Sequence, residues 1–228
     1  MAIRGKTFEL PSTISETIYQ YMKKAIINRE FKPNQRLQEK EIAKLFNVSS
    51  TPVREAFFRL AAEDYLVIDA RKQVLVKEKT LEEVKELYEV VRALDIFASK
   101  KAINILTIKD IDELKRMTKK LGEYYKKRNI QNYLQQNLKI HDTVWQSCGN
   151  KFLYETLSNL MEKISMYRMG NEFSPFSEPH ALEKSYRDHL KLLKAIESKN
   201  IVELEKLVSA HWGEEFFLEK RDDSNEKS

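Results

Sequence analysis

The sequence predicts a mostly α-helical protein of two domains, with its β-structure confined to one short stretch. Apolar residues recur every three or four positions along most of the 228-residue chain, which is the spacing of amphipathic helices. Only five glycines and five prolines interrupt this pattern. The exceptions are two β-rich runs at residues 65–68 and 74–76, which predict a single hairpin. We place the domains at residues 1–79 and 80–228.

Composition and charge narrow the class of protein. No apolar run approaches the roughly 20 residues needed to span a bilayer, and residues 1–10 lack the apolar core of a secretion signal. The single cysteine, Cys148, excludes an intrachain disulfide. We therefore expect a cytoplasmic protein without a membrane partner.

The positive charge is distributed unevenly between the two domains. Residues 1–79 contain 15 Lys+Arg and 10 Asp+Glu, a balance of 15 − 10 = +5, whereas residues 80–228 contain 25 of each. All the excess positive charge therefore lies in the first domain, as expected of a domain that meets a polyanion.

Three helices are predicted in the first domain, at residues 12–28, 39–46 and from about 51 to 63. Asn34 tolerates the left-handed turn that glycine would otherwise supply after the first helix. Pro52 pushes Thr51 toward extended geometry, which makes Thr51 the predicted N-cap of the third helix. The second and third helices are expected to bury their apolar faces: Ile42, Leu45 and Phe46, then Val53, Ala56, Phe57 and Leu60.

Two short helices joined by a tight turn and followed by a hairpin with a basic tip form the layout of a winged helix-turn-helix. The second short helix of this fold enters the DNA major groove with its N-terminus first. Arg54 lies one turn into that helix, on the face opposite the apolar one, where it can reach a base edge or a phosphate. The other residues expected to contact DNA fall into three sets. Those at the start of the helix are Ser49, Ser50 and Thr51, and those expected to hold the DNA backbone are Arg36, Lys40, Lys44 and Arg59. Those in the wing are Arg71 and Lys72.

The second domain is predicted to be an antiparallel bundle of six helices. Capping boxes at Thr80/Glu83 and Thr107/Asp110 open helices that run to about residues 104 and 127. Gly149 suits a helix C-cap and Asn150 suits the following N-cap. The remaining helices are expected at residues 130–147, 150–169, 180–198 and 201–220, with no strand after residue 76.

Three of the four histidines lie on the apolar faces of three different helices of this bundle. They are His141, His189 and His211, and His180 does not belong to the set. Asn137 lies one turn before His141 and can offer a carbonyl oxygen to the same point. Neutral imidazoles are the commonest ligands of zinc-like ions, and bundle cores often hold such sites. The pattern predicts a site for zinc, nickel or manganese.

The first domain resembles the GntR family of bacterial regulators. The resemblance rests on RLQEKEIA at residues 36–43 and VSSTPVREA at residues 48–56. It implies that Arg54 contacts DNA. The family usually has an arginine where this chain has Ser50, and glycines where it has Arg29, Asn34 and Gln73. The usual operator sequence of the family therefore need not carry over.

The second domain resembles the FCD domain, the effector-binding domain of one branch of that family. The resemblance rests on VRALD at residues 91–95, Ile140-His141, Gly149-Asn150, His189 and Ala210-His211. In metal-binding members of this branch, an aspartate and three histidines hold an ion beneath a cavity for a small organic acid, and the resemblance implies such a site here. The histidines correspond to His141, His189 and His211, but Asn137 replaces the aspartate, which weakens metal binding or favours a site completed by an anionic effector.

We therefore expect a homodimeric repressor that binds a palindromic operator and responds to a small organic acid, with Arg92 and Arg168 as candidate effector contacts. No catalytic residue is expected. Two alternatives are a metalloenzyme that activates water and a metal-free sensor of acyl-CoA-type ligands. The first lacks an obvious carboxylate general base beside the histidines, and the second does not explain three inward histidines.

Overall fold

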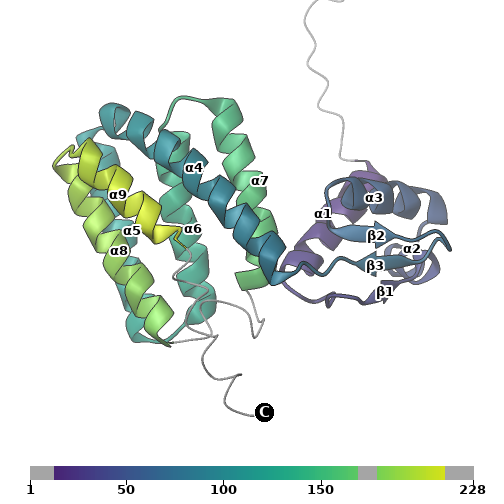
Figure 1. The fold of residues 1–228 in the computed structure, drawn as a ribbon. Helices are drawn as coiled ribbons and strands as arrows, with labels where there is room; N and C mark the ends of the chain where they lie inside the picture. The colour runs from purple at the N-terminus through teal and green to yellow at the C-terminus, as the bar shows by residue number, and fades with distance from the viewer. Residues whose placement is uncertain (1–12, 169–178, 214–228) are drawn as a thin grey trace, which may run out of the picture. The chain divides into compact units, whose positions relative to one another are not determined.

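The computed structural model describes residues 13–168 and 179–213 and divides the chain into two compact units, Met1–Glu78 and Lys79–Ser228. The described part of the first unit holds three helices and three strands (Figure 1). In chain order these elements are α1 (Ile14–Ile27), β1 (Arg36–Leu37), α2 (Glu39–Phe46), α3 (Ser50–Ala62), β2 (Leu66–Ile68) and β3 (Val74–Val76).

The three strands form one antiparallel sheet in the order β1-β3-β2. Val67 of β2 and Arg36 of β1 both pair with Leu75 of β3, so the predicted hairpin is confirmed and gains a third strand. At the tip, the Asp69 carboxylate accepts hydrogen bonds from two backbone N–H groups further along the turn. Strand β1 was not predicted, because two residues are too few to show an alternating pattern.

The core of the first unit forms where α1 packs against α3. The four predicted α3 residues are buried, together with Ile18, Met22 and Ile26 of α1. The prediction that Leu45 is buried is wrong, because its side chain is 61% exposed. The buried face of α2 is centred between Ile42 and Ala43, and Leu45 lies about 110° around the helix from that centre.

The N-cap of α3 lies two residues earlier than predicted. Ser49 is the cap residue, in an extended conformation with φ −71° and ψ 165°, and Thr51 lies within the first turn. Pro52 is then the third helical residue, where the backbone N–H has no intrahelical partner, so the proline costs the helix no hydrogen bond.

The second unit is built from helices alone in its described part, as predicted. They are α4 (Leu81–Ile105), α5 (Ile108–Lys126), α6 (Ile130–Gln146), α7 (Lys151–Arg168), α8 (Pro179–Glu197) and α9 (Ile201–His211). Both predicted capping boxes are present, at Thr80/Glu83 and Thr107/Asp110. Helix α9 ends at His211 with Trp212 as its C-cap, so its predicted extension to residue 220 is wrong at residues 212–213, and residues 214–220 lie outside the described residues.

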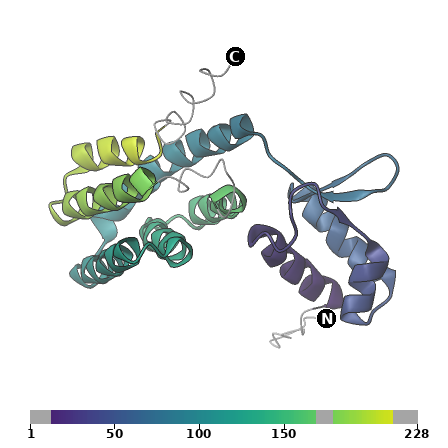
Figure 2. The same ribbon diagram turned by 90° about the horizontal axis from the view of Figure 1, so that it is seen from below.

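The helices of this unit surround a core that contains two tryptophans. Helix α4 packs against α6, α7 and α9, and α5 packs against α6 and α8. Helices α8 and α9 lie side by side in both views (Figures 1 and 2). Trp145 of α6 and Trp212 are both fully buried. No helix in the described part of the chain has the length and apolar character needed to cross a membrane.

Candidate functional site

Three buried histidines converge in the core of the second unit. His141 lies on α6, His189 on α8 and His211 at the end of α9. One ring nitrogen from each lies within 4.8 Å of the others, and the Nε2 atoms of His141 and His211 are 3.2 Å apart. His180 is exposed, as expected for the histidine left out of the set.

The second nitrogen of each ring lies near an oxygen acceptor. His189 Nδ1–H donates to the Ser185 backbone carbonyl at 2.7 Å. His141 Nδ1 lies 3.6 Å from Asp95 Oδ2, and His211 Nδ1 lies 3.6 Å from Asp188 Oδ2. A ring that directs Nδ1–H at such an acceptor keeps a lone pair on Nε2, the tautomer required of a metal ligand.

Asn137 supplies the clearest sign that the cluster suits an ion. Its side chain is on the buried face of α6, one turn before His141, and it is only 1% exposed. Neither its amide oxygen nor its amide nitrogen has a hydrogen-bond partner. Buried polar atoms left in this state are costly. A cation beside the histidines would give the Asn137 oxygen a partner, so the residues fit a metal site.

Asp95 links the cluster to three helices. One carboxylate oxygen accepts hydrogen bonds from Trp145 Nε1 at 2.7 Å and Ser99 Oγ at 2.9 Å, and the other accepts from Trp212 Nε1 at 2.6 Å. Burial alone would raise the pKa of Asp95, but hydrogen bonding and attraction from His141, together with the two indole donors, outweigh it and lower the pKa. Asp95 is therefore an ionised group that ties α4 to α6 and α9.

Asp95 and Asp188 correct the expectation that no carboxylate lies beside the histidines. Burial acts to raise the pKa of Asp188, but the adjacent His211 and Lys184 outweigh it and lower the pKa. A signal for Asp95 was present in the sequence, since it shares the buried stripe of α4 with Val91 and Ala102. Asp188 carries no such signal, because its contact with His211 depends on how α8 meets α9.

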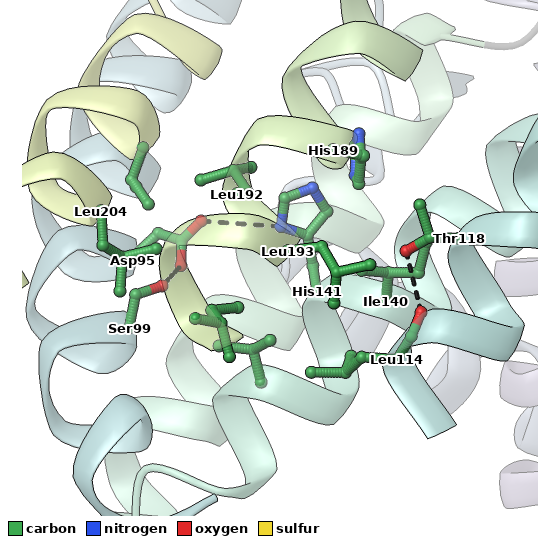
Figure 3. Close-up of a pocket in the computed structure, with 13 residues that line it drawn as sticks. Asp95, Ser99, Leu114, Thr118, Ile140, His141, His189, Leu192, Leu193 and Leu204 are labelled. Atoms are coloured by element: carbon green, nitrogen blue, oxygen red, sulfur yellow. Dashed lines mark hydrogen bonds and ion pairs between the residues drawn. The ribbon is translucent and has the colours of Figure 1, made fainter. Parts of the chain in front are cut away.

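A cavity opens next to the histidine cluster (Figure 3). The volume open to the centres of water-sized spheres is about 30 Å³, so a ligand larger than a few water molecules requires the lining side chains to move apart. Its polar lining residues are Asp95, Ser99, Thr118, His141 and His189, and its apolar ones are Leu114, Ile140, Val144, Leu192, Leu193, Ile196, Leu204 and Val208.

One of the two arginines expected as effector contacts can be located relative to this cavity. Arg92 is half-buried on α4 but is not among the lining residues. Arg168 ends α7, and its side chain lies outside the described residues. The described lining contains no lysine or arginine at all.

In the first unit, Arg54 is held by a glutamate that the sequence analysis did not single out. Its Nε donates to Glu39 Oε1 at 3.0 Å and its terminal nitrogen donates to Glu39 Oε2 at 2.7 Å. The hydrogen bonds from Arg54 are the main reason that the pKa of Glu39 is lowered, and Lys72 of the wing contributes by charge attraction. Arg54 is thus bonded to the Glu39 carboxylate, and Lys72 attracts it by charge alone.

The other residues expected to contact DNA fall into two groups. Arg59 is engaged within the unit, since it pairs with Glu16 of α1 at 2.5 Å and its guanidinium lies 4.0 Å from the centre of the Tyr19 ring. This placement gives Arg59 a role in packing α1 against α3. Ser50 is half-buried, and the remaining candidates are exposed: Arg36, Lys40, Lys44, Ser49, Thr51, Arg71 and Lys72.

Comparison with protein families divides the chain in the same way. Residues 14–76 match the family described as bacterial regulatory proteins, gntR family, and residues 86–214 match the FCD domain. The HTH-type transcriptional regulator YdhC of Bacillus subtilis (strain 168) is 28% identical over 200 residues, covering 85% of each chain. The HTH-type transcriptional repressor RspR of Escherichia coli (strain K12) is 22% identical over 198 residues, covering 87% of this chain and 85% of its own.

Solved structures show the same fold. E. coli McbR/YncC has a TM-score of 0.70 at 20% identity, with 89% of this chain and 94% of that chain covered. A transcriptional regulator GntR from Rhodococcus sp. RHA1 has a TM-score of 0.72 at 17% identity, with 90% and 96% covered. The winged helix-turn-helix, the helical second unit and both family matches lead to one conclusion: this chain belongs to the GntR family of transcriptional regulators, with an FCD domain as its second domain.

Proposed function

We propose that this protein is a homodimeric repressor whose FCD domain binds a small organic acid beside a divalent metal ion. The observation that carries the proposal is the convergence of three buried imidazoles, one ring nitrogen of each within 4.8 Å of the others. Asn137, one turn before His141 on α6, has a buried amide without a hydrogen-bond partner. One chain thus combines a DNA-binding unit with a core suited to sensing a ligand.

The ion would be held by His141, His189 and His211, with the Asn137 carbonyl oxygen as a fourth ligand. Imidazole and amide donors suit zinc, nickel or manganese. When bound, the ion supplies positive charge that attracts an anionic ligand. All four ligands are neutral, so the ion keeps its full charge for that ligand, although Asp95 and Asp188 behind the rings offset part of the field.

The cavity favours an effector with one charged head and an aliphatic body. Eight of its lining side chains are aliphatic. The two lining hydroxyls already donate within the protein, Thr118 to the Leu114 carbonyl and Ser99 to Asp95. A second carboxylate or a row of hydroxyls on the ligand would therefore be buried without donors, which is costly.

One feature of α4 supports pairing of chains on a palindromic operator. Val90 and Phe97 on α4 are 47% and 54% exposed, so this helix offers apolar surface to a second copy. A two-fold dimer presents two winged helices to two half-sites. The relative RspR is named a repressor. The effector would change operator affinity only by binding the DNA-bound and free states with different affinity.

The test uses the intact chain and a duplex selected from a random library. Fluorescence anisotropy would follow binding of that duplex with zinc or with chelator present, while hexanoate or adipate is added. We expect hexanoate with zinc to shift the Kd for DNA by at least about fivefold, and adipate, with the same carbon count, to act far more weakly. An effect that persists in chelator, or that adipate alone produces, would contradict the proposal.

A further inference from the structure

A two-point contact joins the two helices of the helix-turn-helix motif. Glu39 is the first residue of α2, and Arg54 lies in the second turn of α3. The carboxylate takes hydrogen bonds from Nε and from one terminal nitrogen of the guanidinium, at 3.0 and 2.7 Å. Both side chains remain accessible, at 57% for Arg54 and 31% for Glu39. The pair therefore lies at the surface of the motif.

The contact uses only one edge of the guanidinium. Arginine carries five N–H donors arranged in a planar fork, and Glu39 occupies the edge formed by Nε and one terminal nitrogen. The outer end, which carries the other terminal nitrogen, is not engaged by Glu39. Two donors at such an end match O6 and N7 of guanine in the major groove. A guanidinium fixed by Glu39 is thus already oriented, and less side-chain entropy is lost on binding.

A carboxylate at a DNA-facing surface would normally oppose binding, because it repels phosphates. Here two cations offset its charge, since Arg54 is bonded to it and the wing residue Lys72 lies near enough to attract it. Glu41 on the same helix is an exposed acid for which the structure records no such bonds. Glu39 therefore has a bonded partner that it can position, whereas Glu41 is a simple surface charge, and a comparison of the two distinguishes these roles.

We infer that Glu39 determines operator specificity by holding Arg54 in the orientation that reads a guanine base. This inference rests on the DNA-binding part of the proposed function and is independent of the metal and the effector. Glu39 acts through Arg54 and does not itself need to contact a base.

The experiment begins with selection of duplexes from a random library by the intact chain. The base pair read by Arg54 is the G·C pair whose replacement by A·T weakens the native chain but not Arg54→Ala. Discrimination is the ratio of the two Kd values, expected to lie between about 5-fold and 150-fold for a bidentate contact. It is then measured for Glu39→Gln and for the control Glu41→Gln, which removes the same charge from the same helix.

We expect Glu39→Gln to reduce this discrimination at least about fivefold, while its binding to unrelated DNA at low salt stays equal or becomes tighter because a negative charge is lost. Glu41→Gln keeps the native discrimination. In the Arg54→Ala background, Glu39→Gln has no further effect on discrimination. Circular dichroism melts confirm that the variants fold.

Three results would overturn the inference. Native discrimination in Glu39→Gln would mean that Arg54 needs no support. An equal loss of affinity for all duplexes in Glu39→Gln would mean that Glu39 stabilises the fold and does not orient Arg54. A change in discrimination without Arg54 would mean that Glu39 acts directly on the DNA. If the native chain selects no sequence, the proposed function itself fails, which is a distinct outcome from these three.

Discussion

Asn137 is the residue at which this chain departs from the aspartate that the family resemblance implies, and the structure leaves its buried amide without a partner. An Asn137→Asp variant gains an anionic ligand, so we expect its zinc affinity to rise by about tenfold or more. Its metal-free form should lose stability, because a buried carboxylate has no other partner. Chelator-competition titrations and thermal unfolding measure both effects. Asn104→Asp, at an exposed site on α4, is the control. Equal zinc affinity in all three proteins would argue that Asn137 is not a ligand.

Asp95 is predicted to stabilise the folded protein and to increase the affinity of the metal site. Asp95→Asn replaces an acceptor with an amide next to two indole N–H groups, so we expect a loss of about 3–5 kcal/mol in the free energy of unfolding and a loss of about 10–100-fold in zinc affinity. Because the folded pKa of Asp95 lies below its ordinary value of 3.8, its stabilisation is present above that pH and is lost as pH falls through the lower folded pKa. Native stability should therefore fall more steeply with acid than that of the variant. Unfolding curves at several pH values measure this, and parallel curves would refute it.

The left-handed residues explain how the chain dispenses with several glycines. Arg29 and Asn34, which stand where the family usually has glycine, adopt φ values of 59° and 61°. Arg128 has φ 51° before α6, whereas the preceding Lys127 has φ −81°. We expect Arg128→Gly to stabilise the protein by up to about 1 kcal/mol, because strain is relieved, and Lys127→Gly to destabilise it by about 0.5–1 kcal/mol. Chemical denaturation compares the two variants, and the same sign of change in both would refute the account.

At the scale of elements, the helices, turns and caps that depend on neighbouring residues could be predicted from the sequence. Helix α2, the hairpin and both capping boxes depend on residues close together in the chain, and all were predicted. The inward direction of the histidines followed from helical periodicity alone. Strand β1, the contact of Asp188 with His211 and the hydrogen bonds between Arg54 and Glu39 depend on partners 15 or more residues away, and none was predicted.

Helix α8 forms one wall of the cavity, and shortening a side chain on that wall tests whether the effector binds there. Leu193 lines the cavity, whereas Leu190 on the same helix is 38% exposed and does not. We expect Leu193→Ala to enlarge the cavity and shift the preferred effector toward longer aliphatic acids. Thermal shifts of the zinc-loaded protein with butyrate, hexanoate and octanoate measure the preference. Leu190→Ala is the control and should keep the native order, and an unchanged order in Leu193→Ala would place the effector elsewhere.

At the scale of the whole molecule, two compact units share one chain, and the proposed regulation requires that ligand binding in the second alter DNA binding by the first. Helix α4 begins directly after the first unit in sequence, and its Asp95 contacts the histidine cluster. We propose this connection as the route for coupling. Such coupling is reciprocal, so we expect operator DNA to change effector affinity by the same factor.

The most direct test of the metal-centred account is the metal content per chain of protein purified without chelator, measured by inductively coupled plasma mass spectrometry. The native chain is predicted to carry about one zinc, nickel or manganese ion, and His189→Ala to carry almost none. That variant should still bind DNA but no longer respond to hexanoate. A native chain without metal, or equal metal in both proteins, would contradict the account and leave the histidines as polar contacts in the core.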